Sequence, residues 1–310
     1  MNTAISVRSA TRRFGDFVAV ADLTFDVGRA EIFGLLGPNG AGKTTTINLI
    51  TGMLKRHAGE VRVLEHDPQT EARAVRQRIG LVSQETNVYL DLNALDNLWH
   101  HAALYCDDLS QVGERIETLL QMMNLWDRRK DPVREFSGGM KRRLALARAL
   151  LHDPDVILFD EPTLGVDVQG RHVLWEHIKA QQTKGKTFII STNDMAEADA
   201  LCDRLVIIDH GKAIALDTPE TLKFGLGRDI VSLMTTPPID DAEMLFAGMN
   251  VDAITRPGPS QLRLELSNAE ALVGDLVSRL TVDHRIESMR IARPTLDDVF
   301  LHYTGRALRE

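Results

Sequence analysis

The sequence is poor in the residues that build disulfide frameworks, metal clusters and membrane spans. It has two cysteines in 310 residues, Cys106 and Cys202, and their spacing fits neither a disulfide framework nor a zinc site. It contains no run of about 18 apolar residues, so we expect no membrane-spanning helix. Residues 1–10 lack the basic and apolar pattern of a secretory leader. A reducing, cytoplasmic compartment is therefore expected.

Positive charge and aromatic residues are also scarce. The chain has 36 Lys and Arg residues against 44 Asp and Glu residues, which gives a formal charge of −8. This net negative charge argues against a protein that binds nucleic acid or anionic lipid mainly through overall positive charge. Arg142, Arg143 and Arg148 lie on one predicted helix without the interleaved aromatic residues that stack on bases. We expect them to form a solvated or interface face, and we expect no nucleic-acid partner.

The chain instead has the apolar content and the alternating pattern of an α/β protein. Its hydrophobic content of 44% excludes global disorder and is enough for about two domains. Short apolar runs alternate with helical stretches, which predicts a largely parallel sheet covered by helices. We place a first domain at residues 1–222, with an inserted helical subdomain at about 88–150, and a small α+β domain at residues 223–310. The strands expected in the first domain's sheet are Glu31–Leu36, Arg78–Val82, Val156–Phe159, Thr187–Ser191 and Leu205–Asp209, and those of the second domain are Ile230–Thr235, Gln261–Leu266 and Ile286–Ala292.

A glycine-rich segment stands between the predicted strand Glu31–Leu36 and a predicted helix near Thr45. It matches the pattern GxxxxGK[ST], in which glycines let backbone N–H groups turn toward a phosphate and a helix N-terminus adds its dipole. Lys43 is expected to reach the β- and γ-phosphates, and the Thr44 hydroxyl is expected to bind Mg²⁺. The expected phosphate-binding residues are Gly37, Pro38, Asn39, Gly40, Ala41, Gly42, Lys43, Thr44 and Thr45.

Two carboxylates follow the apolar strand Val156–Phe159. Because neighbouring side chains on a strand point in opposite directions, Asp160 is expected in the Mg²⁺ shell, through a water, and Glu161 as the general base that polarises an attacking water. The alternative is a strand that merely ends in solvated acids. The phosphate loop upstream favours the catalytic pair.

A second glycine motif precedes the predicted helix Lys141–His152. Ser137, Gly138, Gly139 and Met140 place a helix-capping hydroxyl, backbone amides and a helix dipole at one point, which makes an anion site. Taken alone, the motif is more often an ordinary helix cap than an anion site.

Together and in this order, these motifs resemble those of the ATP-binding subunits of ABC transporters over about residues 4–220. The resemblance implies an ABC-type P-loop NTPase fold with a mixed sheet. It also implies a head-to-tail dimer, in which Ser137 and Gly139 of one subunit close over the γ-phosphate that the phosphate loop of the other subunit holds. It makes Gln84 a sensor of the γ-phosphate and a ligand of Mg²⁺, together with Thr44 and Asp160. It also places Asp167 in the D-loop at the dimer interface.

The resemblance also assigns two further positions. Phe14 stands where the family usually has an aromatic residue that stacks on adenine; the alternative is a core position beside Phe17. Asn193 replaces the usual switch histidine. Asparagine can donate a hydrogen bond to the γ-phosphate but cannot carry charge or pass a proton near neutral pH, so we expect slow but real hydrolysis. The expected catalytic residues are Lys43, Gln84, Glu161 and Asn193.

The segment Arg293–Leu301 resembles the tail of ATPase subunits from daunorubicin-resistance-type exporters. In those systems the membrane part is a separate polypeptide. The resemblance therefore implies a separately encoded permease, a homodimer or a dimer with a related ATPase subunit, a position on the inner face of the cell membrane, and ATP and Mg²⁺ as cofactors. A helical stretch at Glu85–Trp99 is the expected socket for short cytoplasmic helices of the permease, lined by Val88, Tyr89, Leu90, Leu92 and Leu95; a subdomain core is the alternative.

Two other functions stay open at this point. A soluble ABC-type ATPase acting on ribosomes or chromosomes would ordinarily need two nucleotide domains or a long coiled coil, and the sequence shows neither. A regulatory module that binds ATP with little hydrolysis is favoured by Asn193 and opposed by Glu161. The cargo and the direction of transport are not decided by the residues.

Overall fold

A six-stranded sheet forms the centre of the first part of the chain. In the computed structural model, which describes residues 3–106, 108–163, 166, 168–226, 229–267 and 269–304, its strand order is β5-β6-β7-β3-β8-β9. All neighbouring strands are parallel except β8 and β9. Strands β3 and β6 are buried along their whole length, as expected for a sheet covered on both faces. The six strands are β3 (Ile32–Leu36), β5 (Ile79–Val82), β6 (Val156–Asp160), β7 (Thr187–Thr192), β8 (Arg204–Asp209) and β9 (Lys212–Asp217).

The register of this sheet brings the predicted motifs to one edge. Leu36 at the end of β3 pairs with Thr192 of β7, and Asp160 at the end of β6 pairs with Ser191. Ligands of parallel α/β sheets bind beyond the carboxyl ends of the strands. The segments that follow β3, β6 and β7 therefore meet at this edge.

A three-stranded antiparallel sheet packs on the same core. It has the order β2-β1-β4 and consists of β1 (Thr3–Phe14), β2 (Phe17–Gly28) and β4 (Ala58–Val63). Helix α1 (Lys43–Ile50) follows the phosphate loop and contacts both sheets. One cluster of buried side chains includes Phe25, Ile47 and Leu158, which come from β2, α1 and β6. The phosphate loop is thus anchored to both sheets.

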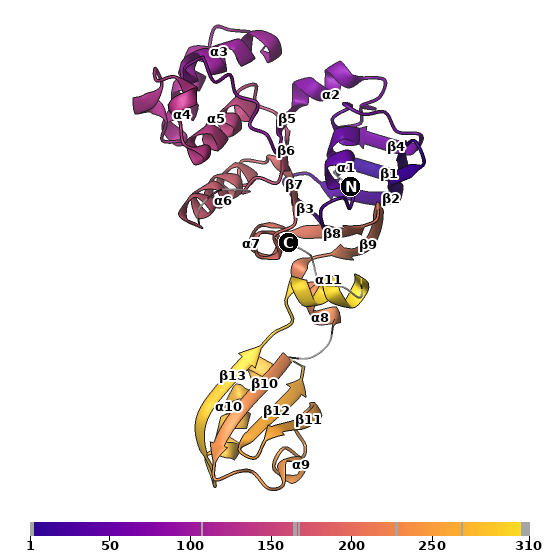
Figure 1. Cartoon of the computed structure of the whole chain (residues 1–310), viewed down its shortest axis with the longest axis vertical. Helices are drawn as coiled ribbons and strands as arrows, with labels where there is room; N and C mark the ends of the chain where they lie inside the picture. The colour runs from indigo at the N-terminus through magenta and orange to yellow at the C-terminus, as the bar shows by residue number, and fades with distance from the viewer. Residues whose placement is uncertain are drawn as a thin grey trace. The chain divides into compact units, whose positions relative to one another are not determined.

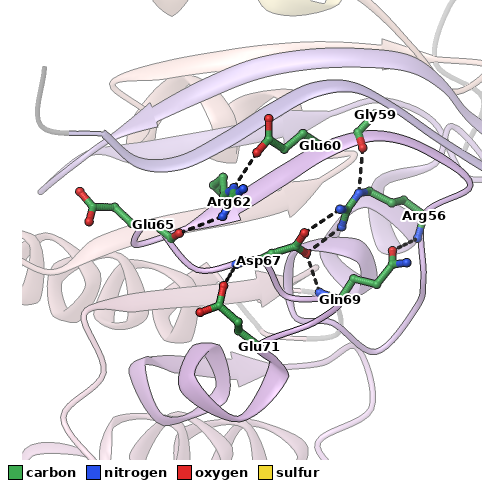
Figure 2. Close-up of polar contacts among 8 residues, drawn as sticks. All are labelled: Arg56, Gly59, Glu60, Arg62, Glu65, Asp67, Gln69 and Glu71. Carbon is green, nitrogen blue, oxygen red and sulfur yellow. Dashed lines mark hydrogen bonds and ion pairs between the residues drawn. The ribbon is translucent and has the colours of Figure 1, made fainter.

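A polar network fixes the connection from α1 to α2 (Ala72–Arg78) (Figure 2). The guanidinium of Arg56 donates hydrogen bonds of 2.8 and 2.7 Å to the two carboxylate oxygens of Asp67 and one of 2.9 Å to the carbonyl of Gly59. The backbone N–H of Asp67 donates to Glu71, at 2.9 Å. This bidentate pair orders the segment that leads through α2 and β5 to Gln84.

Three helices pack together beside β5: α3 (Ala94–Tyr105), α4 (Val112–Met122) and α5 (Gly138–Leu150), with short 3₁₀ turns at Trp126–Arg128 and Val133–Glu135 (Figure 1). The expectation of a helix over Glu85–Trp99 is wrong in its first part, because the helix begins only at Ala94. Asn93 caps it by accepting a 2.8 Å hydrogen bond from the N–H of Asp96. Helices α6 (Val168–Gln182) and α7 (Met195–Leu201) complete the first part of the chain.

The chain divides into two compact units, the first ending at Pro219 and the second beginning at Glu220. The second unit has an antiparallel sheet of order β11-β12-β10-β13, and Leu276 and Leu280 of α10 belong to its core. Its elements are β10 (Asp229–Thr236), α9 (Ala242–Leu245), β11 (Val251–Gly258), β12 (Gln261–Leu266), α10 (Ala269–Leu280), β13 (Arg285–Ala292) and α11 (Leu296–Thr304), and α8 (Pro219–Gly225) lies at the boundary. Strand β11, which contains Pro257, was not predicted.

The expected fold class, a mixed-sheet α/β core with a helical group and an α+β C-terminal part, is confirmed. Every helix in the described part of the chain is too short or too polar to cross a membrane.

Candidate functional site

The loop between β3 and α1 requires glycine at several positions, because its backbone passes close to other segments or has a left-handed φ there. A Cβ atom at Gly37 would lie 2.2 Å from the carbonyl oxygen of Ile208, and one at Gly42 would lie 2.4 Å from that of Ala19. Gly40 and Gly42 have φ angles of 82° and 108°, in the range that favours glycine. The loop thus has the close-packed, inward-turned backbone that a phosphate cradle requires.

Lys43 is the first residue of α1, and its side chain folds back against this loop. Its side chain is buried, and Nζ donates hydrogen bonds of 2.7 Å to the carbonyl of Gly37 and 3.1 Å to that of Pro38. Nζ also lies 3.7 Å from Oε1 of Glu161. Burial lowers the pKa of Lys43, while Glu161 and Asp160 act in the opposite direction. The ammonium group therefore stands between the loop and the acidic pair.

Asp160 and Glu161 diverge for a reason that strand alternation does not supply. Strand β6 ends at Asp160, whose buried carboxylate accepts a 2.5 Å hydrogen bond from the hydroxyl of Ser191. Glu161 follows with a φ of 53°, a left-handed conformation that costs a non-glycine residue about 1–3 kcal/mol. Its N–H donates a 3.0 Å hydrogen bond to the carbonyl of Ser191. A strained turn, held by β7, therefore directs Glu161 toward Lys43.

Arg142 is the main residue of the site that the sequence analysis misjudged. It is 6% exposed, so the expectation that it lies on a solvated or interface face is wrong. Its N–H groups donate five hydrogen bonds of 2.6 to 3.1 Å to backbone carbonyls. The acceptors are Ser83, Gln84, Asp160, Glu161 and Pro162. Arg142 therefore joins the start of α5 to the segment around Gln84 and to both carboxylate positions.

The three predicted Mg²⁺ ligands line one cavity of about 560 Å³. Thr44 and Gln84 are exposed, and Asp160 is buried at the cavity wall. A hydroxyl, an amide oxygen and a carboxylate are the oxygen donors that Mg²⁺ prefers, and Mg²⁺ keeps several waters when it binds. The donor set therefore fits the ion.

The Ser137–Met140 motif begins α5. Ser137 caps the helix as predicted, since its hydroxyl accepts a 3.3 Å hydrogen bond from the N–H of Met140. A Cβ atom at Gly138 or Gly139 would meet no atom within 4 Å beyond its chain neighbours and its own helix backbone, and neither residue has a left-handed φ. Within the described residues, packing requires glycine at neither position, in contrast to Gly37 and Gly42. Asp167 lies outside the described residues, as do Leu164 and Gly165.

Phe14 lies at the end of β1 and is 46% exposed, and the neighbouring Phe17 is 62% exposed, so the alternative of a core position is wrong. The guanidinium carbon of Arg12 lies 4.7 Å from the centre of the Phe14 ring. Phe14 thus offers an accessible aromatic ring whose position is supported by a cation–π contact.

Asn193 directly follows β7 and is held on both sides. The carbonyl of Thr192 accepts a 3.3 Å hydrogen bond from the N–H of Gly37. Asp194 caps α7 and forms a 2.6 Å ion pair with Arg171, which also donates to the carbonyl of Val166. Asn193 is therefore fixed at the sheet edge beside the phosphate loop.

Sequence reasoning missed Ser191, Arg142 and Asn97. Asn97 is buried, and its side chain accepts a hydrogen bond from the N–H of Tyr89 and donates to its carbonyl, at 2.8 and 2.9 Å. It thereby holds a loop from which Tyr89 and Leu90 protrude, 46% and 48% exposed. The only sequence feature that pointed to Asn97 was a polar asparagine on the apolar side of a predicted helix.

Comparison with known proteins adds independent findings. Residues 20–164 match the family described as ABC transporter, and residues 218–304 match the family described as ATP-binding protein DrrA1-3-like, C-terminal domain. The chain is 37% identical over 308 residues to a Nod factor export ATP-binding protein I of Burkholderia lata, covering 99% of this chain and 98% of that protein. It is 34% identical to a linearmycin resistance ATP-binding protein of Bacillus subtilis, covering 99% and 100%, and 36% identical to a daunorubicin resistance ATP-binding protein of Streptomyces coeruleorubidus, covering 98% and 96%.

Solved structures agree with these matches. One, described as the ATP-binding subunit of an ABC transporter, superposes with a TM-score of 0.67 at 28% identity and covers 72% of this chain and 93% of that one. Another, an ATP-binding cassette of an ABC transporter in its ADP conformation, has a TM-score of 0.63 at 25% identity, covering 71% and 93%.

Proposed function

Because this chain belongs to the ATP-binding proteins of ABC transporters, a family of ATPases, we propose that it hydrolyses ATP to power export through a separate membrane-spanning subunit. Export is supported by the names of three relatives, which refer to Nod factor export, linearmycin resistance and daunorubicin resistance. These relatives match over nearly their whole length, which includes the C-terminal unit. The position proposed for the chain is the inner face of the membrane.

Each group of site residues has a separate role in ATP binding and hydrolysis. The phosphate loop and Lys43 bind the β- and γ-phosphates, and Phe14 stacks on the adenine. Thr44, Gln84 and Asp160 would hold Mg²⁺, which would supply positive charge beside the phosphate oxygens. Glu161 accepts a proton from the attacking water as the water oxygen bonds to the γ-phosphorus and the bond to the ADP oxygen breaks. Asn193 donates a hydrogen bond to the γ-phosphate.

A head-to-tail dimer is supported by the contrast between the two glycine motifs. Packing within this chain requires glycine at Gly37 and Gly42, whereas a Cβ atom at Gly138 or Gly139 would meet no atom within 4 Å beyond its chain neighbours and its own helix backbone. Glycine at an exposed helix start costs stability, and close approach of another molecule to the backbone is one reason for a glycine to stand there. A nucleotide held by the phosphate loop of a second subunit fits this requirement. This contrast is the observation that carries the proposed dimer.

The surface beside Gln84 is the proposed docking site for the membrane subunit. The cavity of about 560 Å³ extends from Thr44 and Asp160 past Gln84 to residues of α3 and α5. The exposed side chains of Tyr89 and Leu90 lie on the loop that Asn97 holds. A short cytoplasmic helix of the partner that entered here would touch the segment that Arg142 connects, by hydrogen bonds to backbone carbonyls, to Asp160 and Glu161.

Mixing two inactive variants tests the composite site. Lys43→Ala removes the phosphate-loop cation, and Gly139→Asp blocks the approach to the Ser137 motif. Each variant alone should be inactive as a homodimer. In a mixture, half of the dimers are mixed and each mixed dimer keeps one intact site, so ATP turnover should recover to about a quarter of the wild-type value.

The control is a mixture of Lys43→Ala with Glu161→Gln. Both residues serve the half of the site that their own subunit supplies, so each site of a mixed dimer lacks one of the two groups and turnover should not recover. A mixture of Lys43→Ala with wild type shows whether a dimer with one intact site is active. Failure of the Lys43→Ala and Gly139→Asp mixture to recover, while the mixture with wild type shows such activity, would exclude the head-to-tail arrangement.

A further inference from the structure

Two arginines on α5 differ in how their guanidinium groups are satisfied. Arg142 donates five hydrogen bonds to backbone carbonyls. Arg148, six positions later, has one hydrogen bond within the described part of the chain, to the carbonyl of Asn87, and no ion pair with a carboxylate there. A guanidinium group has five N–H donors, so most of the donors of Arg148 remain available.

Arg148 lines the cavity that begins at the proposed Mg²⁺ ligands. It is half-buried, and burial lowers its pKa, while the groups that favour its charge are the phenols of Tyr89 and Tyr105. A guanidinium withdrawn from water without an anion is unfavourable, and a carboxylate that accepts hydrogen bonds from two of its donors offsets part of this desolvation cost.

The other charged groups of the cavity do not supply that anion. Asp160 accepts a hydrogen bond from Ser191, and Glu85 is exposed and forms no ion pair among the described residues. Arg76 is a second cation of the lining. Burial lowers the pKa of His101 to about 3, so this imidazole is neutral at pH 7. The cavity therefore presents cationic donors beside an aromatic wall, in which the rings of His101 and Tyr105 stack at 4.4 Å.

We propose that a carboxylate side chain on a cytoplasmic segment of the membrane-spanning partner enters this cavity and pairs with Arg148. The inference rests on the proposed function and specifies the chemistry of its docking site. The aromatic wall receives the aliphatic part of the acidic residue, and Arg148 receives its charge. Both ends of the segment from Ser83 to Asn87 are bonded to α5, through Arg142 and Arg148. Pairing at Arg148 therefore acts on the segment that carries Gln84.

A charge exchange tests the pairing. The tagged chain is purified from detergent-solubilised membranes of its native cell, and the membrane protein that accompanies it is identified. Each Asp and Glu in the cytoplasmic segments of that protein is then changed singly to Arg and combined with Arg148→Glu. We expect Arg148→Glu to reduce the retained membrane protein at least 10-fold and one partner substitution to restore it. Arg148→Lys should retain more partner than Arg148→Gln.

Arg143→Gln is the matched control, because Arg143 lies on the same helix, donates one hydrogen bond to the carbonyl of Met123 and does not line the cavity. The pairing is refuted if Arg148→Gln retains as much membrane protein as wild type, or if no partner substitution restores retention by Arg148→Glu. Arg148→Lys and Arg148→Gln are also compared in the isolated protein. If both variants lose partner binding to the same extent, and both also lose ATP turnover to the same extent without the partner, then Arg148 serves only to hold Asn87 and the pairing is refuted. Failure of the wild-type chain to retain any membrane protein would instead overturn the proposed function.

Discussion

The guanidinium of Arg142 donates a 2.6 Å hydrogen bond to the carbonyl oxygen of Glu161, the residue proposed as general base. Because four further carbonyls share this guanidinium, Arg142→Met should leave several buried acceptors unsatisfied. We expect a loss of about 3 kcal/mol or more in the free energy of unfolding, measured with urea, and at least a tenfold loss of ATP turnover. Arg143→Met removes a single hydrogen bond, to Met123, and should cost about 1 kcal/mol with little effect on turnover.

Glu161→Gln separates binding of ATP from its hydrolysis. Glutamine keeps the size of the side chain but accepts no proton from water, so turnover should fall about 10²- to 10⁴-fold. ATP affinity, measured by calorimetry, should change little. Lys43→Ala should weaken ATP binding itself, because it removes the buried cation of the phosphate loop. Comparable losses of affinity in both variants would contradict these roles.

Asn193→His tests how far the missing switch histidine limits the reaction. A charge-assisted contact to the transferring phosphoryl group is worth about 1–3 kcal/mol, so histidine should raise turnover about 5- to 160-fold over a measurable wild-type rate. The variant should also gain a pH dependence near the pKa of imidazole. Wild-type protein without activity at saturating Mg-ATP, restored by Asn193→His, would show that the site does not hydrolyse ATP as found.

The pair of Arg56 and Asp67 predicts a pH-dependent contribution to stability. Hydrogen bonds from Arg56 hold the pKa of Asp67 below its usual value. The stabilisation is therefore complete above the pKa of aspartate in the unfolded chain and is lost as pH falls through the lowered pKa of the folded state. Asp67→Asn should cost about 1 kcal/mol at pH 7. In urea titrations the difference between wild type and variant should shrink steadily with acidification below about pH 4; a constant difference would contradict the assignment.

Charged substitutions in the exposed loop that Asn97 holds should impair export without impairing ATP hydrolysis by the isolated protein. Tyr89→Asp combined with Leu90→Asp places two charges on the proposed docking surface, where both side chains are about half exposed. The substitutions remove the edge contact of Tyr89 with the ring of His100 but leave the hydrogen bonds between Asn97 and the backbone of Tyr89 in place. The isolated protein should keep its ATP turnover and its melting temperature, while export by cells that carry the variant should fall at least tenfold. Unchanged export would refute the assignment of this surface. The same two substitutions to Ser provide the milder comparison.

The site could be predicted as far as local sequence determines it. The phosphate loop has its required context of strand, loop and helix, and Ser137 is a helix cap that needs only its own helix. The positions of Lys43 and Glu161, by contrast, depend on the order of β3, β7 and β6 in the sheet, which brings segments more than 100 residues apart to one edge. The family resemblance, not periodicity, supplied that arrangement.

Arg142 and the segment before α3 show where sequence reasoning fails. An arginine on a helix usually keeps its charged end in water, and nothing local shows that five carbonyls from two other segments surround Arg142. Val88, Leu90 and Leu92 have the apolar character of a helix, but Asn93 caps α3 and Asn97 holds Tyr89 in a loop. In both cases long-range hydrogen bonds override the local pattern.

If this ATPase powers a separate membrane subunit, the two proteins should be isolated together by affinity purification. The tagged chain is isolated from solubilised membranes of its native cell in mild detergent, and the accompanying proteins are identified by mass spectrometry. We expect a polytopic membrane protein in stoichiometric amount, in a complex that hydrolyses ATP. Recovery only in the soluble fraction, with ribosomes, nucleic acid or no partner, would contradict it.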